Sequence, residues 1–226
     1  MSRVLAIGDL HTKTWMIDEA SRLVDQYDAI VFLGDYADNW NTNPAATIGT
    51  WRYLKLFAES FPEKVHVLIG NHDYAYIHKE ISGRSSGWNP ITQQLINSPE
   101  NKKIKDWLLS LPLFIELDRV TYSHAGFTNG WAGDMSLSSL WCDSSPLWAR
   151  PRQYGGNYEY TVAPQVVGHS PVKSVWNPQD GIWLIDTFSE RDDNSPLGDN
   201  TVLEIIDGKE FNIKGFDYVY SYTYCS

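Results

Sequence analysis

The sequence predicts a layered α/β protein. Three short apolar runs typical of buried strands alternate with segments of helical periodicity, and each run ends in a polar block that begins with glycine. The chain has 226 residues, of which 42% are hydrophobic, enough for one sizeable core. Strand, turn and helix units in succession indicate βαβ connections. We therefore expect a single domain that spans residues 1–226.

The first half of the chain alternates regularly. Residues 3–8, 29–33 and 65–69 are apolar runs and predict strands. Between them, apolar residues recur at helical spacing over 15–27 and again over 48–61, where Pro62 closes the second helix. Each helix is therefore expected to pack against the sheet formed by the strands.

The second half is less regular. Residues 74–103 predict an extended excursion with no more than one short helix, and 106–111 predict another short helix. Turn residues at Pro178-Gln-Asp-Gly181 and Asp207-Gly208 indicate hairpins. The strands expected here are 113–117, 120–123, 165–167, 182–185, 202–206 and 211–213, with a final edge strand over 216–224.

Charge and composition exclude several classes of protein. Lys and Arg number 18 against 28 Asp and Glu, a net charge of −10, which disfavours a nucleic-acid-binding surface. No run approaches the roughly 20 apolar residues of a membrane helix, and the N-terminus lacks the apolar region of a signal peptide. Cys142 and Cys225 are too few for a disulfide framework and are expected to be free thiols. We expect a cytoplasmic protein.

Five polar blocks carry the chemistry. Each follows an apolar run, and together they mix carboxylate, amide and imidazole groups, which suit Mn, Fe or Zn better than calcium. In order along the chain they are Gly8-Asp9-Leu10-His11, Gly34-Asp35-Tyr36-Ala37-Asp38, Gly70-Asn71-His72-Asp73, Ser123-His124-Ala125-Gly126 and Gly168-His169-Ser170.

With these blocks the sequence resembles the calcineurin-like metallophosphoesterases. Within them it is most similar to the metal-dependent protein Ser/Thr phosphatases of bacteriophage lambda and bacteria. The resemblance runs from Val4 to about Ile206 and includes Leu147-Trp148-Ala149-Arg150 and Trp183-Leu-Ile-Asp186-Thr187. It implies two mixed β-sheets flanked by helices, with a dinuclear metal site at the strand ends, in the cytosol of a bacterium or of a phage-infected host.

The resemblance also implies roles for individual residues. Asp9 and His11 would hold the first metal, and Asp35 would bridge both ions. The second metal would be held by Asn71, His124 and His169. Two ions bridged in this way lie roughly 3.5–4 Å apart and turn a shared water into hydroxide, which attacks phosphorus in line. The ions are expected to be Mn, with Fe or Zn as alternatives.

Proton transfer and phosphate binding need further groups. The resemblance implies that His72 protonates the leaving alkoxide and that Asp38 orients it. Asn71 is also expected beside the phosphate. Arg150 matches a phosphate-binding arginine of the family, whereas Arg152 and Arg84 are weaker candidates.

Two departures bear on the substrate. Asn39-Trp40 stands where the family has Arg-Gly, so an arginine that grips a phosphate oxygen is missing. Asp73 stands where protein phosphatases commonly have Glu and resembles diadenosine tetraphosphatases instead. Nucleases of the superfamily end in Gly-His-x-His, but Gly168-His169-Ser170-Pro171 lacks the second histidine.

These observations predict a phosphoesterase that hydrolyses phosphate esters, in the first place a protein Ser/Thr phosphatase-like phosphomonoesterase. The substrate is expected to be a phosphorylated protein or a small phosphorylated molecule. A phosphodiesterase or dinucleoside polyphosphate hydrolase is the alternative, because the missing arginine weakens the grip on a dianionic monoester. A metal-binding interaction module without turnover is the more remote alternative.

Overall fold

The structure is a computed structural model of the chain and describes residues 1–40, 42–78, 87–150, 156, 159–161, 164–179 and 181–216. The weaker phosphate-binding candidates Arg84 and Arg152 lie outside these residues, as do Cys225 and the expected edge strand beyond residue 216. Among the described residues, no helix has the length and apolar character needed to cross a membrane.

The first sheet has five strands and carries the N-terminus. Its order is β10-β9-β1-β2-β3, and β1, β2 and β3 run parallel, with Leu5 of β1 opposite Ile30 of β2. Strand β9 pairs antiparallel with both β1 and β10, so the sheet is mixed. The strands are β1 (Arg3–Ile7), β2 (Ala29–Phe32), β3 (Val65–Val67), β9 (Thr201–Ile206) and β10 (Glu210–Gly215).

The second sheet is also mixed and has five strands. Its order is β4-β5-β6-β8-β7, in which β5, β6 and β8 are parallel and the two outer strands are antiparallel to their neighbours. The register of β6 against β8 shifts between Val167 and Pro171. The strands are β4 (Phe114–Leu117), β5 (Val120–Ser123), β6 (Gln165–Pro171), β7 (Trp176–Gln179) and β8 (Ile182–Asp186).

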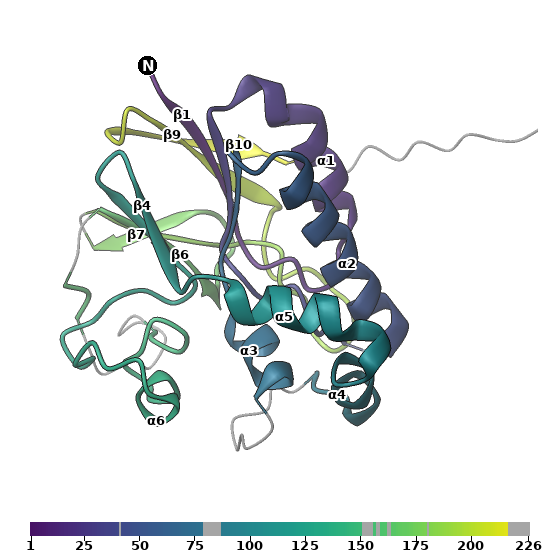
Figure 1. Cartoon of the computed structure of the whole chain (residues 1–226). Helices are drawn as coiled ribbons and strands as arrows, with labels where there is room; N and C mark the ends of the chain where they lie inside the picture. Colours follow the sequence, from purple (N-terminus) through teal and green to yellow (C-terminus); the bar gives the residue numbers. More distant parts are fainter. Residues whose placement is uncertain are drawn as a thin grey trace, which may run out of the picture.

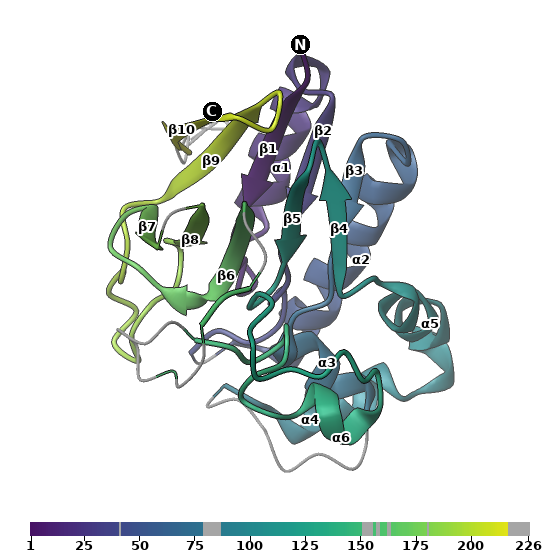
Figure 2. The same cartoon turned by 90° about the vertical axis from the view of Figure 1, so that its left-hand side faces the viewer.

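The helices surround this pair of sheets. Helices α1 and α2 cover one face of the first sheet, and α3, α4 and α5 gather near the ends of its parallel strands (Figure 1). The second sheet lies on the opposite face of the first (Figure 2). The helices are α1 (Trp15–Leu23), α2 (Pro44–Ser60), α3 (Asn71–Ile77), α4 (Pro90–Ile96), α5 (Lys102–Ser110) and α6 (Leu137–Leu140), with 3-10 turns at Val24–Gln26 and Pro99–Asn101.

Successive side chains of β1 point to opposite faces of the first sheet and contribute to two different hydrophobic cores. Leu5 and Ile7 belong to the core between the first sheet and the helices, whereas Val4 and Ala6 belong to the core between the two sheets. All four side chains are 2% exposed or less, so β1 is buried on both faces. A central strand of this kind must be apolar throughout, as the sequence of β1 is.

The predicted fold class is confirmed, because the chain forms two mixed sheets flanked by helices. The expectation of no more than one short helix over residues 74–103 was wrong for the described part of this range, while residues 79–86 lie outside the described residues. Helix α3 begins at Asn71, and α5 begins at Lys102 rather than at residue 106. Helix α4 begins at Pro90. The side chain of the preceding Asn89 accepts a hydrogen bond from the Ile91 N–H. Asn at the N-cap and Pro at the first helical position were the available signals for α4.

Candidate metal centre

The polar blocks of the sequence converge at one edge of both sheets. Asp9, Asp35 and Asn71 follow β1, β2 and β3, three parallel neighbours of the first sheet. His124 follows β5, and His169 lies within β6, at the register shift of the second sheet. Because the carboxyl ends of parallel strands lie at the same edge, side chains distant in sequence meet there.

Two groups of potential metal ligands share one carboxylate. Asp9, His11 and Asp35 form the first group, and Asp35, His124 and His169 form the second. Within each group the ligand atoms lie within 4.8 Å of one another. Asp35 therefore lies where one side chain can contact two ions, which is the position expected for it.

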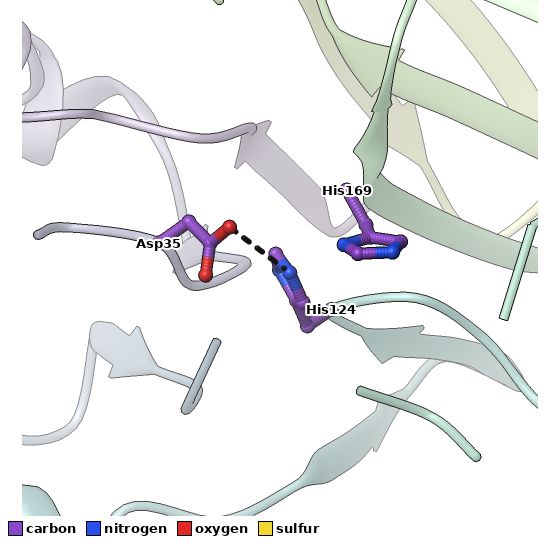
Figure 3. A group of neighbouring side chains, drawn as sticks. All are labelled: Asp35, His124 and His169. Atoms are coloured by element: carbon purple, nitrogen blue, oxygen red, sulfur yellow. Dashed lines mark ion pairs between the residues drawn. The ribbon is translucent and has the colours of Figure 1, made fainter. Parts of the chain in front are cut away.

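The hydrogen bonds of His124 direct its free nitrogen into the second group. Its Nδ1–H donates to the Leu33 carbonyl at 3.1 Å, so Nε2 carries the lone pair. That nitrogen lies 2.7 Å from Asn71 Oδ1 and 3.3 Å from Asp35 Oδ2, as Figure 3 shows for the carboxylate. Three electron-pair donors thus face one another, an arrangement that a cation between them stabilises.

The other two histidines are oriented in a similar way. His11 Nδ1–H donates to the Asp38 carbonyl at 2.7 Å, which leaves Nε2 free beside Asp9, 3.9 Å from Oδ2. His169 Nε2 is buried and has no hydrogen-bond partner among the described residues. A buried imidazole nitrogen without a partner is costly unless it binds a metal. The donor set of carboxylate, imidazole and amide therefore fits two divalent ions of the Mn, Fe or Zn type.

Four residues of the site have a strained backbone conformation. His11, Asp35, Asp38 and His169 all have positive φ, between 44° and 63°, where non-glycine residues are uncommon. Such conformations persist only where surrounding structure enforces them, and they cluster at functional sites.

Two glycines supply the space that the carboxylates need. A Cβ on Gly70 would lie 2.2 Å from Asp35 Oδ1, and one on Gly168 would lie 2.1 Å from Asp9 Oδ1. Because real Cβ atoms do not approach oxygen so closely, any larger residue would displace these two carboxylates. The glycines of the sequence blocks thus have a steric function.

Burial and neighbouring charges shift the pKa values of these side chains. Burial and the charges of Asp186 and Asp35 raise the pKa of Asp9 well above its usual range. Burial opposes the ionisation of Asp35, but the neighbouring imidazoles of His124 and His72, when they are protonated, hold its pKa well below the usual range. Burial and the nearby Arg150 hold the pKa of His169 well below its ordinary value, so this imidazole is neutral and its lone pair is available.

His72 lies beside the shared carboxylate and contacts a second one. Its Nε2 is 3.7 Å from Asp35 Oδ2, and its Nδ1 is 3.4 Å from Asp38 Oδ2. Burial alone would lower the pKa of His72, but the charges of Asp35 and of Asp38, whose Oδ2 lies 3.4 Å from Nδ1, raise it to about 9. A protonated imidazole at the edge of the metal groups is placed to give a proton to a leaving group.

Both groups of potential metal ligands contribute residues to the lining of a cavity of about 230 Å³. Arg150 lines it, and its Nη1 donates to the His169 carbonyl at 3.0 Å, so the guanidinium is fixed beside the second group. Asp38, Asn39, His72 and Asp186 also line this cavity. Of the described site residues that the sequence predicted, Asn71 and His124 do not line the cavity, but His124 Nε2 lies within 3.3 Å of both Asn71 Oδ1 and the lining residue Asp35.

Sequence reasoning missed two acidic residues of the pocket. Asp186 is 1% exposed and accepts a hydrogen bond from Ser189 Oγ at 3.0 Å. It ends the apolar run 182–185 just as the other blocks end theirs, and that was the signal for it. Glu190 contributes the second carboxylate, and no local pattern in the sequence pointed to it.

Glu190 holds the residues that replace the expected Arg-Gly pair. Its Oε2 accepts a hydrogen bond from Asn39 Nδ2 at 2.9 Å, and its backbone carbonyl accepts one from Trp40 Nε1 at 2.8 Å. Lys13 Nζ lies 3.4 Å from Oε1. Asn39, Trp40 and Glu190 thus form one wall of the cavity, in which the Glu190 carboxylate is paired with the Lys13 ammonium.

Comparisons with known proteins agree with the fold. A cold-active protein tyrosine phosphatase from a psychrophilic Shewanella species superimposes with a TM-score of 0.61 at 19% identity, over 94% of this chain and 80% of that chain. A metallophosphoesterase from Sphaerobacter thermophilus superimposes with a TM-score of 0.55 at 16% identity, over 96% and 89%.

Sequence comparison gives a shorter match and a longer one. A symmetrical bis(5'-nucleosyl)-tetraphosphatase from Vibrio cholerae is 24% identical over 106 residues, which are 47% of this chain and 36% of that protein. The match thus spans about a third of the curated relative. The calcineurin-like phosphoesterase family matches residues 2–220. The chain belongs to the calcineurin-like phosphoesterase family of metal-dependent phosphoric ester hydrolases.

Proposed function

We propose that this metallophosphoesterase hydrolyses phosphate esters with two divalent ions, Mn in the first place and Fe or Zn as alternatives. The observation that carries the proposal is the position of Asp35, whose carboxylate belongs to both ligand groups and lies 3.7 Å from His72 Nε2. When bound, two such ions activate a water molecule and neutralise charge on the phosphate. We propose Asp9 and His11 as ligands of one ion, Asn71, His124 and His169 as ligands of the other, and Asp35 as the shared ligand.

The remaining residues act on the substrate itself. We propose that His72 gives its proton to the leaving oxygen, while Asp38 keeps the imidazole oriented. Arg150 has guanidinium N–H groups beyond the one that binds the His169 carbonyl, and these bind phosphate oxygens. Asn71, whose Oδ1 lies 2.7 Å from His124 Nε2, is proposed to contribute its amide as well.

A phosphomonoester on a protein or a small molecule is the first candidate substrate. Arg150 beside the ligand groups favours it, because a guanidinium binds the extra negative charge of a monoester. The solved neighbour from Shewanella is named a protein tyrosine phosphatase, and the Vibrio relative is named a tetraphosphatase. Both names describe phosphate hydrolysis, but on different substrates.

A phosphodiester is the second candidate, favoured by the wall around Asn39. Asn39 gives its amide N–H to Glu190, so it offers no cation to a phosphate, and the nearby Lys13 ammonium is already paired with Glu190 at 3.4 Å. A singly charged diester tolerates such a wall better than a doubly charged monoester does. A dinucleoside polyphosphate carries more charge and fits it less well.

Two chromogenic substrates test the proposal. The Mn-loaded protein is expected to hydrolyse p-nitrophenyl phosphate, bis-p-nitrophenyl phosphate or both, and a chelator should abolish this turnover. The ratio of the two kcat/KM values distinguishes a monoesterase from a diesterase. If the metal-loaded protein hydrolyses neither substrate, nor a dinucleoside polyphosphate, the chain is an interaction module and the proposed function is wrong.

Substitutions at Asn39 test the wall directly. Asn39→Arg alone is expected to change monoester turnover little, because Glu190 would pair with the new guanidinium. Combining it with Glu190→Gln should raise monoester kcat/KM at least about tenfold, since a charge-assisted hydrogen bond contributes about 1.5–3 kcal/mol. Steady-state kinetics on one monoester and one diester provide the measurement.

Arg150→Ala supplies the converse variant. It should raise KM for monoesters and lower kcat/KM by a similar factor. If Asn39→Arg suppresses all activity while Arg150→Ala leaves it unchanged, the pocket is built for a diester and the monoester candidate is refuted.

A further inference from the structure

Tyr76 shares helix α3 with His72 and follows it by four residues, one helical turn later. Residues at this spacing lie on the same face of a helix. Both side chains reach the same carboxylate: His72 Nδ1 is 3.4 Å from Asp38 Oδ2, and the Tyr76 hydroxyl bonds to Asp38 Oδ1. Helix α3 therefore contacts both oxygens of Asp38.

The direction of the tyrosine hydrogen bond is fixed by a backbone amide. The Asn89 N–H donates to Tyr76 Oη at 2.7 Å, and an amide N–H can only donate. The hydroxyl proton consequently points to Asp38 Oδ1, at 2.5 Å between the oxygens. Burial and the Asp38 charge both raise the pKa of Tyr76, which keeps this proton in place.

Packing holds the hydroxyl in this position. Tyr76 is fully buried, and the Trp51 and Trp88 rings lie 5.6 Å and 6.3 Å from its ring. On the other side, Gly87 approaches Asp38 so closely that a Cβ there would be 3.0 Å from Asp38 Cβ. Asp38 itself has a φ of 57°, so its backbone needs support from its neighbours.

We propose that Tyr76 is a positioning residue of the reaction, which fixes the Asp38 carboxylate so that its second oxygen orients the His72 imidazole. The tyrosine does not line the cavity among the described residues and touches no substrate. Its contribution passes through Asp38 to the proton donor. This inference rests on the proposed function, in which His72 protonates the leaving group.

Tyr76→Phe tests the role, with Tyr74→Phe on the same helix as the matched control. Tyr76→Phe is expected to lower kcat about tenfold on an alkyl phosphate and much less on p-nitrophenyl phosphate, because an activated leaving group needs little protonation. KM should not change. Tyr74→Phe should leave both substrates unaffected.

Combination with His72→Asn separates positioning from general damage. Once the proton donor is gone, the double variant should lose no more activity than His72→Asn alone, because the two residues act in sequence. Equal losses on both substrates, or additive losses in the double variant, would overturn the proposal.

A structural readout keeps the inference separate from the proposed function. In a crystal structure of Tyr76→Phe, Asp38 is expected to rotate and its separation from His72 Nδ1 to exceed the 3.4 Å of the native chain. An Asp38 that keeps its native position in the variant would refute the positioning role, whether or not the wild-type protein hydrolyses the substrates offered. A wild-type protein without turnover would refute only the proposed function.

Discussion

Asp35→Asn is expected to remove bound metal and turnover together. The carboxylate belongs to both ligand groups, and an amide carries no charge with which to hold two cations. Loss of an outer partner of a metal ligand commonly costs about 10–100-fold in metal affinity, so loss of a shared ligand should cost more than about 100-fold. Elemental analysis after dialysis, together with steady-state kinetics, measures both effects.

A matched acid-to-amide variant controls for this change. Asp25→Asn alters an exposed carboxylate outside the pocket and should keep the wild-type metal content. Circular dichroism should show both variants folded, because the Oδ1 atom of an asparagine can still accept the hydrogen bond that the His72 N–H gives to Asp35 at 2.9 Å. Two metals per chain and full activity in Asp35→Asn would show that the ligand assignment is wrong.

His72→Asn is expected to leave metal content normal and to slow the reaction selectively. In the proposed mechanism the imidazole gives a proton to the leaving group and does not bind a metal, and general acid catalysis contributes about 10²–10⁴-fold. The full loss in kcat is expected for an alkyl phosphate, whose leaving oxygen is strongly basic. For p-nitrophenyl phosphate, which leaves readily as the phenolate, the loss should be much smaller.

His78→Asn serves as the control, since it changes a histidine at the end of the same helix. It should match the wild type on both substrates. Asp38→Asn should reproduce the selectivity of His72→Asn in weaker form, because the imidazole would remain but lose its partner. Equal losses on the two substrates in His72→Asn would count against the histidine as proton donor.

The fold and the convergence of the site were accessible from local sequence patterns. Apolar runs such as 3–8 and 29–33 predict parallel strands, and the polar block after each run must then lie at a common edge. Asp9 and Asp35 meet for this reason. The roles of these residues in binding and catalysis stay predictions until the variants are measured.

Other features depend on tertiary contacts that no local pattern encodes. Glu190 reaches Asn39 across 151 positions of sequence, and Tyr76 reaches Asp38 across 38. Neither residue lies in a block that resembles a site. Helix α4 was missed because it has only seven residues, too few for a clear helical pattern of apolar positions. Short helices depend on tertiary packing, and α4 packs against α2 and α3.

The division of the ligand set between two sheets has a consequence for biosynthesis. The His169 N–H donates to Asp9 Oδ1 and Oδ2, at 3.1 and 3.2 Å, although the two residues are 160 positions apart. A nascent chain that has exposed only the parallel strands β1, β2 and β3 displays Asp9, His11, Asp35 and Asn71 without the imidazoles of His124 and His169. Ions that reach the chain on the ribosome would therefore meet only part of the proposed ligand set, and complete loading would await the docking of β5 and β6 of the second sheet.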